Sequence, residues 1–121
     1  MRRVVITGMG MVTPLGHGVI TNWKNLLDGK TGISKIDTFN VSDITCQIAG
    51  QVPRKEDKYG LDIDKFIEPK EQRKIDRFIQ FGIIAALEAV EDSNWRPKTE
   101  TQQERTGVMV GSGIGGLQSI V

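Results

Sequence analysis

The sequence has a single cysteine, no long apolar run and no excess of charge of one sign, and each shortage excludes a class of protein. One cysteine, Cys46, cannot form an internal disulfide, which agrees with a reducing compartment. No stretch approaches the roughly 18 apolar residues of a membrane span, and residues 1–7 hold too short an apolar run for a signal peptide. We therefore expect a cytoplasmic protein without a membrane partner.

Charge and composition are those of an ordinary globular chain. The 121 residues are 38% apolar and 26% charged, and the net charge is +1. Charges of mixed sign create no sustained basic field that would hold a nucleic-acid backbone, so we expect no nucleic-acid partner. The length is that of one domain.

Two short apolar runs frame the chain. Residues 3–8 and 106–111 are β-branched or apolar, lack alternation and end in glycine, which is typical of strands buried on both faces of an α/β sheet. Apolar residues at helical spacing predict a helix over 19–28, with Gly29 as a C-terminal glycine, and a longer one over 70–92. The second half of the longer helix is apolar almost all round, so we expect it to be buried on several sides.

The remaining segments give weaker signals. A strand is predicted over 47–52, a helical turn near 62–67 and a polar connection over 93–103. The whole order is a βαβ-like plan with a parallel sheet and a right-handed crossover. So few buried strands and helices cannot cover both faces of a sheet, and residues 113–121 begin a new apolar element. We expect this chain to be part of a longer protein.

Glycine-rich turns follow both apolar runs. Residues 111–116 fit the spacing G-x-G-x-x-G of dinucleotide sites, but the acidic residue that such sites place about 20 positions further on would lie past Val121. A tight turn is the simpler interpretation. Residues 8–16 begin in the same way, but Thr13 stands where the third glycine belongs and Pro14 interrupts the expected helix. We expect a structural turn there as well.

Neither Cys46 nor His17 has the setting of a catalytic residue. Cys46 has no glycine elbow, no following helix and no neighbouring histidine that would lower its pKa. His17, the only histidine, lies between two glycines in a turn. We interpret both as structural, and we expect no metal and no cofactor.

Basic residues gather at the start of the longer predicted helix. Lys70, Arg73, Lys74 and Arg77 recur at spacings of three and four, which places them on neighbouring faces of one helix. Cations at a helix N-terminus oppose the macrodipole, at a cost of about a few tenths of a kcal/mol each. This cost suggests an acidic partner, and a solvated surface explains the pattern about equally well.

Taken together, four segments resemble the β-ketoacyl-acyl-carrier-protein synthase II family, over the whole chain and in register. The segments are Arg2–Gly10, then Trp23-Lys24 with Leu26-Leu27 and Gly32-Ile33, then Lys70–Lys74 with Asp76 and Phe78–Gln80, and finally Gly111–Leu117. No one segment is specific, whereas the set is.

The resemblance implies a thiolase-like α/β fold, a homodimer, and a decarboxylating Claisen condensation in fatty acid synthesis. In that family a cysteine carries the acyl chain, two histidines stabilise the enolate and the oxyanion needs backbone donors. By the resemblance these three side chains would come after Val121. Residues 1–121 are therefore expected to be the first part of the family's N-terminal domain, without catalytic residues and inactive alone.

Two sites are implied by position in the family. Lys70, Arg73 and Lys74 match the basic patch that receives the acyl carrier protein, with Arg77 adjacent to it. Pro69 departs from the pattern, because relatives often carry a basic residue there. Ile114 matches the residue that lines the acyl pocket near the dimer interface.

Two other functions remain open from the sequence. A non-catalytic thiolase-fold partner, such as a chain-length factor, would share these segments and differ at the nucleophile position. A nucleotide-binding α/β domain would need the acidic ribose partner that the glycine-rich turn lacks within these residues.

Overall fold

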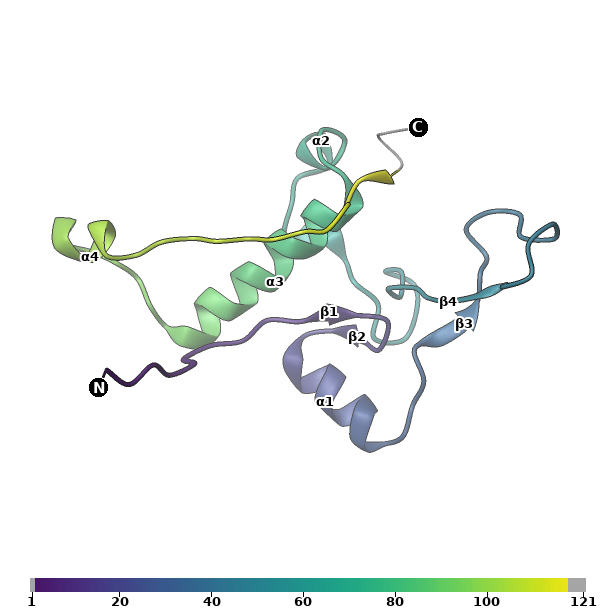
Figure 1. The fold of residues 1–121 in the computed structure, drawn as a ribbon, viewed down its shortest axis with the longest axis horizontal. Coiled ribbons are helices and arrows are strands. Elements are labelled where there is room, and N and C mark those ends of the chain that lie inside the picture. The colour runs from purple at the N-terminus through teal and green to yellow at the C-terminus, as the bar shows by residue number, and fades with distance from the viewer. Residues whose placement is uncertain (1, 118–121) are drawn as a thin grey trace. The chain divides into compact units, whose positions relative to one another are not determined.

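The computed structural model describes residues 2–117, and the chain forms two compact units (Figure 1). Unit 1 comprises Met1–Gly10 and Asp64–Val121, and unit 2 comprises Met11–Ile63.

Unit 2 begins with a small hairpin and a helix. Strand β1 (Val12–Thr13) pairs antiparallel with β2 (Gly16–His17), and helix α1 (Val19–Leu27) follows. Asp28 is the C-cap of α1. The helix predicted over 19–28 is thus confirmed.

A second antiparallel pair completes the strands of unit 2. Strand β3 (Ile33–Lys35) pairs with β4 (Ile48–Gly50), which confirms the strand predicted over 47–52. An isolated parallel bridge joins Arg54 and Leu61, and the 3-10 helix η1 (Ile63–Lys65) confirms the predicted helical turn. The buried apolar side chains of unit 2 are Val41 and Leu61.

Two buried asparagines of α1 hold the hairpin. The Asn22 amide donates to the carbonyls of Gly16 and Gly18 at 2.9 and 2.8 Å, and its oxygen accepts from the Thr13 hydroxyl. The Asn25 amide donates to the Leu15 carbonyl at 2.7 Å. The side chains of α1 therefore add hydrogen bonds to the carbonyls around the turn of the hairpin, beside the short backbone pairing of β1 and β2.

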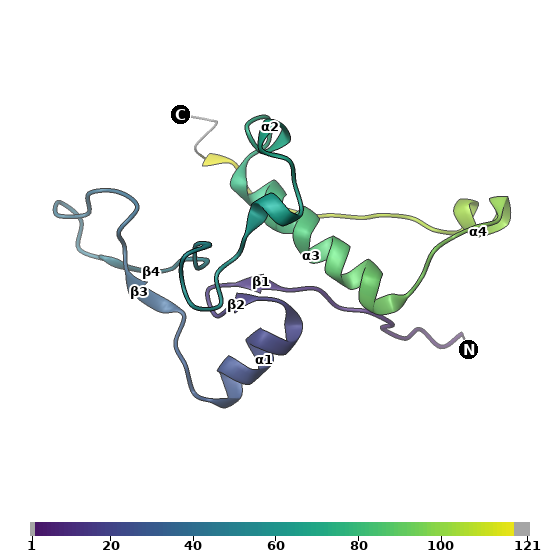
Figure 2. The same ribbon diagram turned by 180° about the vertical axis from the view of Figure 1, so that it is seen from behind.

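Unit 1 consists of helices α2 (Pro69–Gln72), α3 (Arg77–Ser93) and α4 (Glu100–Glu104), with extended segments beside α3 (Figures 1 and 2). The prediction of one helix over 70–92 is wrong at its start. Asp76 takes an extended conformation, with φ −65° and ψ 157°, so the helix stops and restarts at residue 77.

Residues 8–10 lie directly against the backbone of α3. A Cβ at Gly10 would collide with the carbonyl of Ala85, and one at Gly8 would lie 2.8 Å from Cβ of Ser93. The Met9 N–H donates to Oδ2 of Asp92 at 2.9 Å. The first glycine pair therefore allows a strand-like segment to pack closely on a helix, and the turn predicted within residues 8–16 is confirmed at residues 14–15.

The buried parallel sheet predicted within this chain is absent from residues 2–117, where both strand pairs are antiparallel. Residues 3–8 and 106–111 are extended without a ladder, and their side chains are exposed, as at Val4 (95%) and Met109 (98%). The apolar pattern indicated burial, but a strand is buried only where other strands and helices cover it. The described structure is a mixed α/β arrangement with small sheets.

The connection predicted over 93–103 contains helix α4, which the sequence analysis missed. The Thr99 hydroxyl accepts from the Gln102 N–H at 3.3 Å, and the Gln102 side-chain oxygen accepts from the Thr99 N–H at 3.2 Å. This reciprocal capping box starts the helix, and its signature, Thr-x-x-Gln, is visible in the sequence.

Candidate functional site

The basic residues predicted as a docking patch lie exposed on and after α2. Lys70 belongs to α2, Arg73 is its C-cap, and Lys74 follows. Lys74 Nζ forms an ion pair with Oε1 of Glu71 at 2.6 Å, and Arg73 Nε donates to the Pro69 carbonyl at 3.4 Å. The structure thus brings Lys70, Arg73 and Lys74 together on one short exposed segment.

The break before α3 changes the electrostatic interpretation of this patch. Lys70, Arg73 and Lys74 do not lie in the first turn of a long helix, so the predicted cost against the macrodipole does not apply to them. Arg77 alone is in the first turn of α3, and its guanidinium lies 5.4 Å from the centre of the Phe81 ring. A cation–π contact of this kind offsets the unfavourable position of Arg77.

Two glutamines that the sequence analysis did not single out hold the patch in place. The buried Gln80 amide donates to the carbonyls of Gln72 and Ile75, at 3.0 and 3.1 Å. Gln72 Nε2 donates to the Ile67 carbonyl at 2.7 Å and to Oδ1 of Asp64 at 2.9 Å. The Gln80 bonds satisfy carbonyls between α2 and α3, and the Gln72 bonds tie the end of α2 to the residues before it, so the segment that carries Lys70, Arg73 and Lys74 has a defined course.

Ile114 lies in the glycine loop 113–116 of unit 1, and its side chain is 74% exposed. A Cβ at Gly113 would have no neighbour within 4 Å, whereas one at Gly115 would lie 2.6 Å from Cζ of Phe78. Gly115 has φ +66°, a conformation that favours glycine. Residues 113 and 114 form a bend, in agreement with a turn within residues 111–116.

An apolar groove of about 540 Å³ runs between α3 and the extended segment that precedes the loop. Phe78, Ile83 and Leu87 line one side, and Val108 and Val110 line the other. The second half of the longer predicted helix was expected to be buried on several sides, but its Ile83 and Leu87 are 39% and 47% exposed, so that expectation is wrong for this face of α3. The fully buried apolar side chain of α3 is Ile84, on a different face.

Cys46 and His17 belong to unit 2. Cys46 is exposed, and its thiol donates to the Ile48 carbonyl at 3.5 Å. Within residues 2–117 no group of three His, Cys, Asp or Glu side chains could hold a metal ion. In the same part of the chain, no helix combines the length and the hydropathy needed to cross a bilayer.

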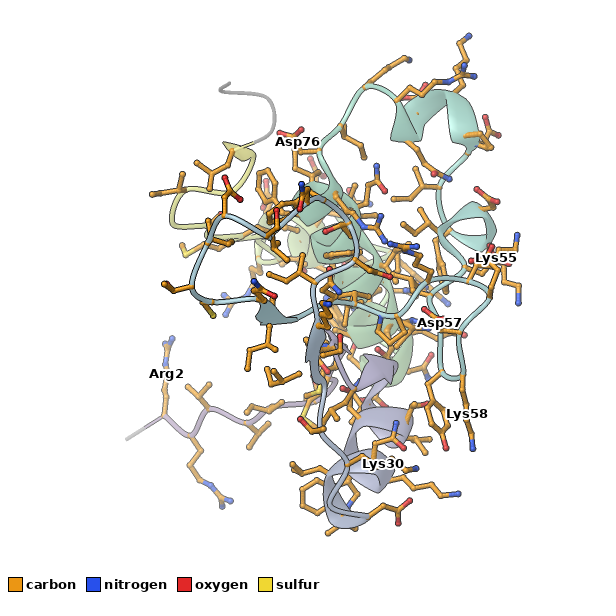
Figure 3. All side chains as sticks on the ribbon, turned by 90° about the vertical axis from the view of Figure 1, so that its right-hand side faces the viewer. Arg2, Lys30, Lys55, Asp57, Lys58 and Asp76 are labelled. Atoms are coloured by element: carbon orange, nitrogen blue, oxygen red, sulfur yellow. The ribbon has the colours of Figure 1, made fainter. Side chains whose placement is uncertain are left out.

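Unit 2 contains one cluster with shifted pKa values. Lys30 Nζ donates to Oδ1 of Asn25 at 2.8 Å, to the Tyr59 hydroxyl at 3.1 Å and to Oδ2 of Asp28 at 3.1 Å; Lys30 and Lys58 both lie near the Tyr59 ring (Figure 3). The Tyr59 hydroxyl and then Asp28 raise the pKa of Lys30. The hydrogen bond from Lys30, supported more weakly by Lys58, lowers the pKa of Tyr59. The sequence analysis did not find this cluster, whose members lie up to 29 positions apart.

Residues 1–120 match the family described as "Beta-ketoacyl synthase, N-terminal domain". The chain belongs to the β-ketoacyl synthase family. Among curated relatives, the 3-oxoacyl-[acyl-carrier-protein] synthase 2 of Rhizobium meliloti (strain 1021) is 47% identical to this chain, over 100% of the chain and 29% of the relative. Proteins of the same name from Vibrio cholerae and Staphylococcus aureus (strain COL) are 44% and 41% identical, each over 98% of the chain and 27% of the relative.

This β-ketoacyl synthase chain therefore spans between 27% and 29% of the length of those relatives. The family predicted from four short segments is confirmed over nearly every residue. Identities of 41% to 47% also cover the segments that carry Lys70, Arg73, Lys74 and Ile114.

Proposed function

We propose that the protein carrying this chain is an elongating 3-oxoacyl-acyl-carrier-protein synthase of fatty acid synthesis. The observation that supports it is identity of 41% to 47%, over 98% to 100% of the chain, to proteins named 3-oxoacyl-[acyl-carrier-protein] synthase 2. Its fold is then the thiolase-like α/β fold. Residues 1–121 form the first part of the N-terminal domain, in which 3–8 and 106–111 become strands of a buried sheet, and the protein acts as a homodimer.

The proposed reaction joins an acyl thioester to malonyl carrier protein. Malonyl thioester loses CO₂, and the electron pair of the broken C–C bond remains as an enolate. The enolate carbon attacks the acyl thioester carbonyl, a C–C bond forms, and the cysteine thiolate leaves. Cys46 is not proposed as that cysteine, because it is exposed on unit 2 and donates only to a backbone carbonyl.

In the proposal, Lys70, Arg73 and Lys74 receive the acidic carrier protein. Their exposure supports this role. The ion pair between Lys74 and Glu71 is expected to be weak, because both side chains are more than half exposed. Exposed ion pairs contribute only about 0–1 kcal/mol, so a carrier-protein carboxylate can replace Glu71 at little cost. Complementary charge of this kind acts mainly on the association rate and weakens with salt.

Ile114 forms one wall of the acyl pocket in the proposal. It is an apolar side chain, 74% exposed, in a loop with glycines on both sides. A pocket that takes an alkyl chain needs an apolar wall, and one methylene in such a pocket changes discrimination by about 10-fold to 200-fold.

The test is an assay of the complete protein with acyl-carrier protein and malonyl-carrier protein. We expect release of CO₂ together with a product two carbons longer than the acyl donor. Decarboxylation or binding without elongation would identify a non-catalytic partner such as a chain-length factor, and specific NAD(P) or ATP binding would identify a nucleotide-binding domain. Either result contradicts the proposal.

The carrier surface is tested separately by charge reversal. We expect Lys70→Glu combined with Arg73→Glu to raise the KM for acyl-carrier protein about tenfold with little change in kcat. Loss of a docking contact weakens the ground state and the transition state equally, and this produces such a pattern. Arg96→Glu combined with Lys98→Glu, at exposed positions outside α2, is the matched control with the same change in net charge. An equal effect of the control would show that net charge and not the patch is responsible.

A further inference from the structure

The glycine loop that carries Ile114 rests on the start of α3. At Gly115, a Cβ would lie 2.6 to 3.0 Å from three ring atoms of Phe78. At Gly116, a Cβ would collide with the carboxylate of Asp76 and would lie 3.3 Å from the Phe78 ring. The space that a side chain would fill at two successive residues is therefore already occupied by α3.

Asp76 has a second feature that fits this contact. It is the N-cap of α3, but its carboxylate makes no capping hydrogen bond to the helix. A carboxylate at an N-cap ordinarily accepts from the N–H groups of the first turn. Here Oδ2 lies instead beside Gly116, and Asp76 is next to the end of α3 that the loop approaches (Figure 3).

The two ends of the loop differ sharply. Gly111 and Gly113 have open space where a side chain would lie, whereas Gly115 and Gly116 have none. Ile114 stands between an unconstrained glycine and a constrained one, and Gly115 has φ +66°. A displacement of Phe78 or Asp76 is therefore transmitted to the backbone next to Ile114, while a change at Gly113 is absorbed in open space.

We propose that Phe78 and Asp76 are positioning residues for Ile114, and that they help to set the length of acyl chain that the enzyme accepts. Phe78 also lines the apolar groove beside α3, and its ring lies against Gly115 of the loop. This inference rests on the proposed function, in which Ile114 is a wall of the acyl pocket. Phe78 and Asp76 act through the loop and do not themselves contact the acyl chain.

The first experiment measures the contact independently of catalysis, in the complete protein. Ile114 is labelled at its δ1 methyl, and its NMR resonance is compared between the parent protein and the variants Phe78→Leu and Gly113→Ala. We expect Phe78→Leu to move the resonance clearly more than Gly113→Ala does. An unchanged resonance in Phe78→Leu would overturn the inference whatever the enzyme's activity.

The second experiment measures chain-length preference, as the ratio of kcat/KM for a long acyl-carrier protein to that for a short one. We expect Phe78→Leu and Gly116→Ala to change this ratio about tenfold, and Gly113→Ala to leave it unchanged. A purely structural defect would lower both kcat/KM values equally and leave the ratio constant, and that result would overturn the inference.

A paired substitution protects the test against simple misfolding. In the background Asp76→Ala, Gly116→Ala no longer meets the carboxylate, so we expect its effect on the ratio to be smaller than in the parent. Ile114→Ala separates the proposed pocket role of Ile114 from the proposed positioning role of Phe78 and Asp76. If Ile114→Ala leaves the ratio unchanged, the pocket role of Ile114 fails; if it changes the ratio while the Phe78 and Gly116 variants do not, only the positioning role fails.

Discussion

Unit 2 pairs its short strands with one another, whereas the two apolar extended segments of unit 1 form no ladder and are exposed. In unit 2, the amides of Asn22 and Asn25 donate to the hairpin, and β3 pairs with β4 along its whole length. In unit 1, Ile6 is 84% exposed and Val108 is 89% exposed. Both units expose apolar side chains, as at Ile20 of unit 2 (85%), but the extended segments of unit 1 also lack backbone partners in a ladder.

The two units differ because their segments differ in composition: those of unit 2 are rich in polar side chains, and the extended segments of unit 1 are apolar. A loop-rich segment with asparagine, lysine and tyrosine can satisfy its own backbone locally. An apolar strand gains about 1.5–3 kcal/mol for each large side chain that is removed from water, but only where other elements cover it. The two extended segments of unit 1 are thus expected to gain stability only where additional apolar surface covers them.

The largest expected effect tests where the apolar interior of unit 1 lies. Ile84 is fully buried, so Ile84→Ala should lower the free energy of unfolding by about 2–5 kcal/mol. Its neighbour Ile83 lies in the groove and is 39% exposed, so Ile83→Ala should cost much less in the 121-residue chain. Urea unfolding measures both.

The variants Ile83→Ala and Ile84→Ala can also be compared in the complete protein. If the groove is covered there, the cost of Ile83→Ala should rise toward that of Ile84→Ala. Equal costs already in the 121-residue chain would contradict the exposed groove described here.

The sequence predicted local elements well and their surroundings poorly. Helix α1 was found because its signals, apolar spacing and a terminal glycine, all lie within residues 19–29. The break at Asp76 was missed, because apolar spacing continues across it and the amide that satisfies the freed carbonyls comes from Gln80, further along the chain. Helix α4 was missed although Thr99 and Gln102 show a capping box.

The candidate site shows the same limit. The exposure of Lys70, Arg73 and Lys74 follows from their charge, and the family resemblance marked Ile114. The contact of the loop with Phe78 and Asp76 spans almost 40 positions, so no local pattern could predict it. The burial of residues 3–8 and 106–111 was predicted from composition, which reports what a strand requires and not whether its neighbours are present.

The second expected effect tests the hydrogen bonds from α1 to the β1–β2 hairpin of unit 2. Asn22→Ala removes two donations to carbonyls and one acceptance from a hydroxyl, and the buried Gly16 carbonyl loses its side-chain donor, so the change should cost about 1–3 kcal/mol. Lys24→Ala, on an exposed face of the same helix, is the control and should cost less than about 0.5 kcal/mol. Equal effects in thermal unfolding would show that helix propensity, and not the amide network, holds the hairpin.

A smaller effect concerns α4. Thr99→Ala removes the acceptor of the capping box and should destabilise this short helix by about 1 kcal/mol. Amide hydrogen exchange measures it locally: exchange over residues 100–104 should become faster, with α3 unchanged. Thr101→Ala leaves the cap intact and is the matched control.

The smallest expected effect is a titration in unit 2. Tyr59 is the only tyrosine, so tyrosinate absorbance reports its ionisation alone. We expect its pKa to lie below the ordinary 10.0, and Lys30→Gln to raise it more than Lys58→Gln does, because Lys30 is the first cause of the shift. A lowered pKa of Tyr59 adds stability only as pH rises through that pKa, whereas the raised pKa of Lys30 gives stability that is present at neutral pH and is lost as pH rises through the folded value. If the pKa of Tyr59 is the same in the parent and in Lys30→Gln, then the hydrogen bond from Lys30 to the Tyr59 hydroxyl does not form in solution. The side-chain hydrogen bonds that stabilise unit 2 would then be those of Asn22 and Asn25.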